Sequence, residues 1–295
     1  MSSLQQTNAA TKESLRSRFR RFSFRSLSPE PMLATTEIEL PFAAYQQRQW
    51  HEVSPEGLRA RAERLTPGQK FAFQAGSWVP VPYVGHAIVA MAGNRVENAP
   101  LMTQLANIQN ELSYNFADTR SLYLLPEASL HQTIANTLSA ERHQQMVVDR
   151  GLSSDYPRLV TNTFDDLPTS TVSDRLSMRM IGLSIFSNAV GLLGVFDQEE
   201  DFQRIIRFRN HFYGHEQIGN MGIRRTRPFI GHITVAYIES PLDSAGRHRL
   251  VDAAQTINQL LSSRDVRFYL PVAELRAYEH LAEFKALPGL PVYRL

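Results

Sequence analysis

From about residue 51 onward, stretches with apolar residues three or four positions apart alternate with short, strongly apolar stretches. The first pattern predicts amphipathic helices and the second predicts strands. Leu101, Leu105, Ile108 and Leu112, for example, recur at steps of four, three and four and fall on one helix face. The predicted elements are a helix at 54–65, strands within 71–91, a helix from Pro100, strands at 121–125, 129–136, 176–186 and 189–196, a helix from Asp197, a strand at 230–238, a helix around 250–261 and a strand at 266–278.

Polar residues mark the starts of two of these helices. Ser54 stands before Pro55, which predicts an N-cap followed by a proline in the first helical turn. Asp197, with Glu200 three residues later, has the spacing of a capping box. Residues 139–174 are polar and irregular, and they predict an insertion between the two halves of the pattern.

Both halves of the predicted order run strand, helix, strand, and each final strand carries the tripeptide His-x-Thr. The two tripeptides are His131-Gln132-Thr133 and His232-Ile233-Thr234, 101 positions apart. Because residues i and i+2 of a strand lie on the same face, each tripeptide presents an imidazole beside a hydroxyl. The repeated pattern predicts two similar lobes related by a pseudo-two-fold axis, with the two His-x-Thr strands meeting in the middle.

Four stretches carry a resemblance to a known family. They are LLPEASLHQT, LSMRMIGLSIFSNAVGLLGVF, RPFIGHITVAYI, and the helix and terminal strand that follow. Over about residues 80–280 the chain resembles the two-histidine phosphoesterase superfamily, which includes 2′-5′ RNA ligase-like proteins and cyclic phosphodiesterases. The resemblance implies an α+β, bilobal fold in which two pseudo-symmetric lobes with antiparallel sheets surround a concave cleft. It also implies that His131, Thr133, His232 and Thr234 are the catalytic residues.

The chain departs from the family pattern at three positions close to these residues. Gln132 stands where the family usually has an apolar residue, and Gly231 stands where it often has proline. Tyr237 stands where bacterial RNA ligase-like members often have arginine. These differences leave the expected fold unchanged and bear on the identity of the substrate.

The expected function is a metal-independent phosphodiesterase that hydrolyses a cyclic phosphate, at a 2′,3′-cyclic nucleotide or RNA end, or a 2′-5′ type linkage. A histidine side chain, with its usual pKa of about 6.5, can accept or donate a proton near neutral pH. One histidine then acts as base and the other as acid, while the threonine hydroxyls donate to phosphate oxygens. No metal or cofactor is expected. Two alternatives stay open: a nucleotide- or RNA-binding module with little turnover, and a phosphoesterase for a cyclic signalling nucleotide.

Four further residues are candidates for substrate binding. Arg225 and Arg227, just before the second tripeptide, have the side chain that grips a phosphate through two hydrogen bonds. Tyr237 is a candidate for stacking on a base, although strict alternation from His232 turns it to the opposite face of the strand. His86 lies on a predicted strand that borders the cleft.

The composition limits the class of protein. The 295 residues include no cysteine, which excludes disulfide bonds and cysteine-ligated zinc. The net charge of +2 is nearly balanced, so the chain as a whole is not a general polycation for nucleic acid. The longest apolar stretch, Ile181–Phe196, is shorter than the roughly 18 residues that a membrane span needs. These features predict a monomeric cytoplasmic protein without a membrane span.

Residues 1–50 differ from the rest of the chain. They are serine-rich and carry five arginines between positions 16 and 25. This composition predicts a disordered tail ahead of a two-lobed body at 51–295. An organellar targeting segment and an arm that contacts RNA or a membrane surface are the alternatives.

Overall fold

The computed structural model describes residues 39–117, 120–167 and 175–295. The strands are β1 (Phe71–Gln74), β2 (Ser77–Pro80), β3 (Gly85–Met91), β4 (Leu122–Leu124), β5 (His131–Ser139), β6 (Ser177–Ile185), β7 (Ala189–Val195), β8 (His232–Ile238), β9 (Arg267–Tyr269), β10 (Val272–Tyr278) and β11 (Val292–Arg294). The α-helices are α1 (Phe42–Val53), α2 (Pro55–Glu63), α3 (Ala99–Asn115), α4 (Ala140–His143), α5 (Tyr156–Asp165), α6 (Glu199–Gly214), α7 (Glu216–Asn220) and α8 (Ser244–Ser262). Three short 3₁₀ or π segments complete the description: η1 (Val96–Asn98), η2 (Glu127–Ser129) and η3 (Gln144–Val148).

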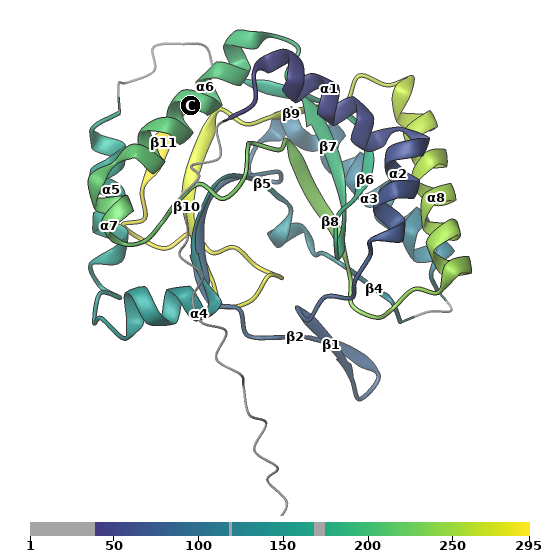
Figure 1. The fold of residues 1–295 in the computed structure, drawn as a ribbon, viewed down its shortest axis with the longest axis horizontal. Coiled ribbons are helices and arrows are strands. Elements are labelled where there is room, and N and C mark those ends of the chain that lie inside the picture. The colour runs from purple at the N-terminus through teal and green to yellow at the C-terminus, as the bar shows by residue number, and fades with distance from the viewer. Residues whose placement is uncertain (1–38, 118–119, 168–174) are drawn as a thin grey trace, which may run out of the picture. The chain divides into compact units, whose positions relative to one another are not determined.

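An antiparallel sheet forms the centre of this α+β fold (Figure 1). Its strands follow the order β11-β10-β3-β5-β8-β7-β6-β9, and β4 pairs with β8 outside this path. The two His-x-Thr strands, β5 and β8, are neighbours in the middle of the order, as the sequence pattern predicts. A separate hairpin, β1 with β2, projects beyond the sheet (Figure 1).

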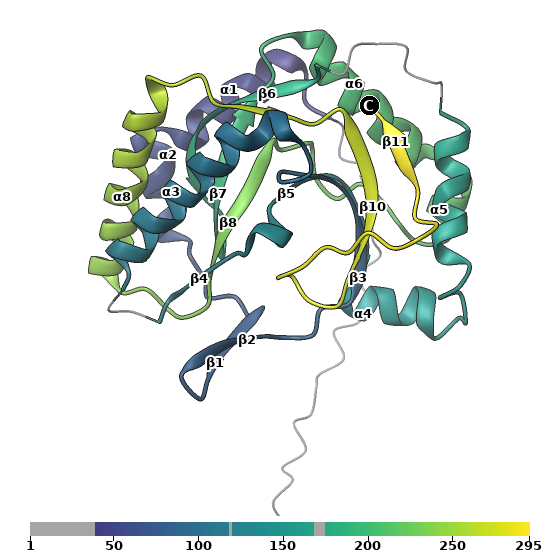
Figure 2. The same ribbon diagram turned by 180° about the vertical axis from the view of Figure 1, so that it is seen from behind.

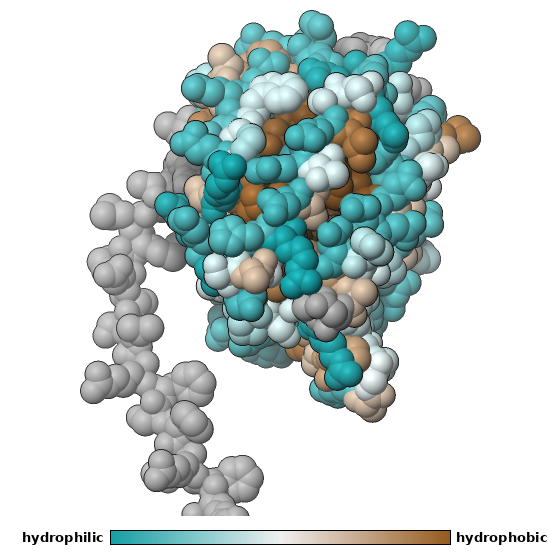
Figure 3. All heavy atoms as spheres, turned by 90° about the vertical axis from the view of Figure 1, so that its right-hand side faces the viewer, coloured by the Kyte–Doolittle hydropathy of each residue, from teal (hydrophilic) through white to brown (hydrophobic). Residues whose placement is uncertain are grey.

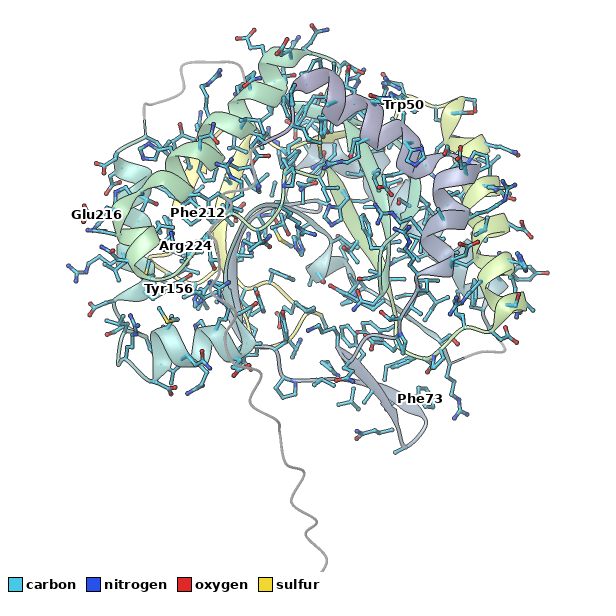
Figure 4. The ribbon with its side chains drawn as sticks, viewed as in Figure 1. Trp50, Phe73, Tyr156, Phe212, Glu216 and Arg224 are labelled. Carbon is cyan, nitrogen blue, oxygen red and sulfur yellow. The ribbon has the colours of Figure 1, made fainter. Side chains whose placement is uncertain are left out.

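Two groups of helices flank the sheet. Figures 1 and 2 show α1, α2, α3 and α8 on the side of β6 and β7, and α4 to α7 on the side of β3 and β10. The predicted apolar stripe of α3 is buried, and α6 buries three phenylalanines, Phe202, Phe208 and Phe212. Phe212 is labelled on α6 in Figure 4. These apolar faces pack into the core, and their burial fixes where the helices lie, because apolar burial is the main favourable term in folding.

The folded body begins earlier than the sequence pattern indicated. Residues 42–53 form α1, so part of the predicted tail belongs to the body, while residues 1–38 lie outside the described residues. The α1 side chains of Tyr45 and Gln49 are fully buried. Tyr45 donates to Gly194 O at 3.0 Å, and Gln49 donates to Gly194 O and Gly231 O at 2.9 Å each. Helix α1 therefore braces the end of β7 against the residue that precedes β8.

Two further expectations need adjustment. The predicted insertion at 139–174 contains the helices α4 and α5 with η3 between them, and residues 168–174 lie outside the described residues. Asp197 does not cap α6, because its carboxylate accepts from Arg179 at 2.9 and 3.0 Å instead. Ser54, by contrast, accepts from Gly57 N at 3.1 Å and caps α2 as predicted.

No helix among the described residues is both long and apolar enough to cross a lipid bilayer.

Candidate active site

A cavity of about 490 Å³ opens where β5 and β8 separate. Among the described residues these strands pair directly at one position, Gln132 with Ile233, and β4 pairs with β8 further along. The strands therefore diverge, and side chains from both face the space between them. The lining comprises Arg61, Lys70, Tyr83, Ala87, Leu125, Ser129, His131, Thr133, Asn136, Ser139, Phe186, Ser187, Asn188, Ala189, Arg227, His232, Thr234, Tyr237, Tyr278, Leu281 and Phe284.

All four expected catalytic residues line this cavity: His131 and Thr133 from β5, and His232 and Thr234 from β8. The two imidazoles are held in the same way. His131 Nδ1 lies 2.7 Å from Ser129 O, and His232 Nδ1 lies 3.1 Å from Ile230 O, in each case two residues back. Because a carbonyl oxygen only accepts, Nδ1 must carry the proton in both rings. Nε2 of each neutral ring is therefore an acceptor, and that of His131 accepts from the Thr133 hydroxyl at 3.2 Å.

Burial makes both histidines neutral near pH 7. It lowers the pKa of His131 from 6.5 to about 4, against the opposing effect of the hydrogen bond to Ser129. It also lowers the pKa of His232 to about 4, and the positive charge of Arg227 acts in the same direction. Phe284 packs on His131 with ring centroids 4.1 Å apart, and Phe186 packs on His232 at 4.9 Å. Both rings are therefore set as proton acceptors in the free protein.

Gln132, the first departure from the family pattern, joins the two strands. Its side chain is fully buried. Its Nε2 donates to Ile230 O at 3.0 Å, and its Oε1 accepts from the backbone N–H of His232. Ile230 O is also the carbonyl that orients the His232 ring. The amide thus replaces ladder hydrogen bonds at the point where the strands separate, and it fixes one histidine relative to the other.

Replacing Gln132 by leucine is expected to lower the free energy of unfolding by about 1–3 kcal/mol, because the His232 N–H and the Ile230 carbonyl would lose a buried partner. Urea unfolding at pH 7 measures this change. The matched control is Gln145→Leu, which removes a hydrogen bond to Glu141 on an exposed helix surface. The control is expected to stay within about 0.5 kcal/mol of the parent protein. Equal stabilities of the two variants would contradict the clamping role of Gln132.

Of the two candidate arginines, the structure places only Arg227 in the cavity lining. No carboxylate of a described residue forms an ion pair with Arg227, so its guanidinium is available to an anionic ligand. Burial lowers the pKa of this group, with Arg209 acting in the same direction. Arg225 lies outside the lining, where its side chain donates to Asn210 Oδ1 at 2.6 Å and pairs with Glu39 at 3.4 Å.

Tyr237 faces the cavity, contrary to the expectation from strict alternation. The reason is a β-bulge in β8. Gly191 of β7 pairs with Thr234, whereas the preceding residue, Val190, pairs with Ala236, so Val235 is an extra residue. One extra residue reverses the alternation of side chains beyond it. Tyr237 therefore lies on the same side as the histidine and threonine of its strand.

His86 does not reach the cavity. It contacts His143 of α4 and Tyr156 of α5, with ring centroids 5.4 and 4.9 Å apart. Figure 4 labels Tyr156 within the helix group on the β3 side of the sheet. Burial, with some repulsion from His143, lowers the pKa of His86 to about 4. The neighbouring Ala87 is the β3 residue that faces the cavity.

Several lining residues were not predicted, because no pattern within their own helix, strand or loop marks them as part of a site. They are Arg61, Lys70, Tyr83, Asn136, Ser139, Phe186, Tyr278 and Phe284. Lys70 Nζ lies 3.3 Å from the ring centroid of Tyr83, and Arg61 pairs with Glu52. Asn136 alone was accessible from the sequence, because it stands 101 positions before Tyr237, the same offset that separates the two histidines.

A second hollow, of about 430 Å³, lies between α2 and the start of α8. Figure 3 views this side of the protein, where hydrophobic patches show between hydrophilic side chains. Arg247 in its lining is already occupied, because it donates to Leu242 O at 3.1 Å and to Glu63 O at 2.9 Å. Across both hollows and the rest of the described chain, no group of three or more His, Asp or Glu side chains is arranged to hold a metal ion.

Comparison with known proteins shows a likeness of fold and gives no indication of the activity. No protein-family model matches the chain, and no curated protein is significantly similar to it. Among solved structures, the fold is similar to that of a conserved protein of unknown function from Agrobacterium tumefaciens, with a TM-score of 0.53. The two share 19% sequence identity over 75% of this chain and 90% of that one. At this identity the likeness shows a shared fold alone and carries no statement about chemistry.

Proposed function

We propose that this protein is a phosphodiesterase that opens a cyclic phosphate, or cleaves a 2′-5′ type linkage, by two-histidine acid–base catalysis. The proposal includes the bilobal arrangement of the two-histidine phosphoesterases, with β5 and β8 as the central strands of two related halves. The supporting observation is the matched pair of imidazoles: two histidines from adjacent strands, each anchored through Nδ1 to the carbonyl two residues back, line one cavity.

The reaction divides between the two rings. One Nε2 takes a proton from a water molecule as its oxygen attacks phosphorus. The bond from phosphorus to the 2′ or 3′ ribose oxygen breaks, and the other imidazole, protonated, gives its proton to that leaving oxygen. Thr133 and Thr234 donate hydroxyl hydrogen bonds to the non-bridging oxygens, where charge increases in the transition state. Proton exchange with solvent restores both rings.

The acid requires a proton that neither half-buried imidazole holds in the free protein near pH 7. A bound phosphate supplies the reason for proton uptake, because a neighbouring negative charge raises the pKa of a histidine. In the free protein the positive charge of Arg227 disfavours a proton on His232. When Arg227 pairs with the bound anion, that repulsion becomes weaker. Substrate binding thus converts two bases into one base and one acid.

The test is hydrolysis by the purified protein, in the presence of a metal chelator, of 2′,3′-cyclic nucleotides, 2′-5′ oligoadenylates and cyclic dinucleotides. Turnover of 2′,3′-cyclic nucleotides or 2′-5′ linkages is expected to persist in chelator. Turnover of cyclic dinucleotides alone would assign the protein to signalling nucleotides instead. Binding of nucleotide or RNA without any hydrolysis would reject the enzymatic proposal in favour of a binding module.

A further inference from the structure

The two His-x-Thr segments continue beyond the threonine in the same way. In β5, Val89 of β3 pairs with Thr133 and Ile88 pairs with Ala135, so Ile134 is an extra residue. In β8 the extra residue is Val235, at the same place relative to its threonine. Each bulge reverses the side-chain alternation and directs one more residue into the cavity. That residue is Asn136 in β5 and Tyr237 in β8.

Each bulge is held from the helix layer by a side-chain donor. Arg209 of α6 donates through Nη1 to Ile134 O at 2.6 Å, and Gln109 of α3 donates through Nε2 to Val235 O at 3.0 Å. Val235 O also accepts from the backbone N–H of Leu125 at 3.0 Å, so Gln109 supplies a second donor to that buried bulge carbonyl. The two donors stand 100 positions apart, close to the offset of 101 between the motifs. The bulges are therefore a matched feature of both halves.

The surroundings of the two directed residues also match. Asn136 pairs across the sheet with Ala87, and Tyr237 pairs with Ala189, and both alanines line the cavity. The alanine leaves room on that side of each directed residue, while on its other side Tyr237 pairs with Tyr123 of β4 and its ring lies 5.8 Å from that of Phe71. Neither the Asn136 amide nor the Tyr237 hydroxyl forms a side-chain hydrogen bond within the described part of the chain. The Asn136 backbone, in contrast, is fixed on both sides by the Tyr213 hydroxyl, at 2.8 and 3.1 Å.

From this geometry we propose that Asn136 and Tyr237 determine specificity on the two sides of the reacting phosphate. This inference rests on the proposed function and extends it to the groups that flank the phosphate. Tyr237 offers a flat ring beside His232 for stacking on a base, and burial raises the pKa of its hydroxyl to about 12, so the hydroxyl stays protonated. Asn136 offers an amide beside His131, which donates to and accepts from a ribose hydroxyl or a base edge. Equivalent positions thus carry an aromatic ring on one side and an amide on the other.

Two probes separate contacts to the flanking groups from contacts to the phosphate: adenosine 2′-phosphate and inorganic phosphate, each measured by calorimetry. Tyr237→Ala is expected to weaken adenosine 2′-phosphate binding by roughly 5- to 150-fold, the range for loss of one stacked base. Tyr237→Phe keeps the ring and is expected to bind within about 2-fold of the parent protein. Asn136→Ala is expected to weaken nucleotide binding by about 2- to 12-fold, the range for one hydrogen bond. None of these changes is expected to alter inorganic phosphate binding.

The bulge itself is tested by Gln109→Leu, with Gln145→Leu as the surface control. Gln109→Leu is expected to weaken adenosine 2′-phosphate binding in the parent protein, and to add nothing in a Tyr237→Ala background, because it acts through Tyr237. Additive losses in this double-mutant cycle would overturn the positioning role of Gln109. Equal losses for both probes, or no loss in Tyr237→Ala, would overturn the specificity role while leaving the proposed function standing. A parent protein that binds neither probe would overturn the proposed function itself.

Discussion

Alanine at position 131 or 232 is expected to lower the rate of phosphodiester hydrolysis by about 10²- to 10⁴-fold, the usual contribution of one proton-transfer group. The two losses are not expected to multiply in the double variant, because a base without an acid completes only half of the reaction. Single-turnover kinetics with a 2′,3′-cyclic nucleotide measures these rates. The Nδ1 hydrogen bonds to Ser129 and Ile230 give each ring one defined orientation, which the alanine side chain cannot reproduce.

The matched control for these variants is His248→Ala, on the exposed surface of α8. Its turnover is expected to equal that of the parent protein. Activity that survives in both His131→Ala and His232→Ala would contradict the two-histidine mechanism. Loss of activity in the control as well would indicate a general loss of the folded protein, which circular dichroism detects independently.

Acidification is expected to destabilise the protein between about pH 6.5 and pH 4. His86, His131 and His232 each have a pKa lowered from 6.5 to about 4 in the folded protein, chiefly by burial. In this window the unfolded chain binds protons that the folded protein does not, so the free energy of unfolding falls as the pH is lowered. Each histidine contributes up to about 1.4 kcal/mol per pH unit. Below pH 4 both states are protonated, and these histidines add no further loss.

Urea unfolding at pH 7, 6, 5 and 4.5 measures this loss of stability. His86→Gln is expected to remove part of the dependence, since glutamine does not titrate, and burial also lowers the pKa of its neighbour His143, which contributes as well. The exposed His248→Gln variant is the comparison. Stability that stays constant from pH 7 to pH 4.5 would contradict the lowered pKa of these histidines.

Local sequence patterns predicted the elements better than their edges. The stripe of Leu101, Leu105, Ile108 and Leu112 correctly indicated α3, because period and burial agree along a helix. The capping-box spacing at Asp197 was misleading, because two arginines from distant segments, Arg179 and Arg267, compete for its carboxylate. The beginning of the body was placed too late, because two of the three buried residues of α1, Gln49 and Glu52, are polar and the helix is stabilised by tertiary contacts of Tyr45 and Gln49.

In the candidate site, too, some residues were predicted from the sequence and others were not. The repeated His-x-Thr pattern indicated which four residues share the cavity, and their catalytic role stays a prediction. Alternation along β8 predicted the wrong face for Tyr237, since a bulge depends on the register with the neighbouring strand and on a donor from α3. Arg225 and Arg227 are equivalent in the sequence, and only the presence of Asn210 and Glu39 beside Arg225 separates them.

The sequence alone determined most of the order of the elements and placed the two His-x-Thr tripeptides on strands, since these follow from the period of apolar residues and from a repeated tripeptide. Only the tertiary structure decided where β5 and β8 separate, which side chains enter the resulting cavity, and how far burial lowers the pKa of its histidines. The physical reason is that register, bulges and desolvation depend on residues far apart in the chain, such as Gln132 with Ile230 and Gln109 with Val235.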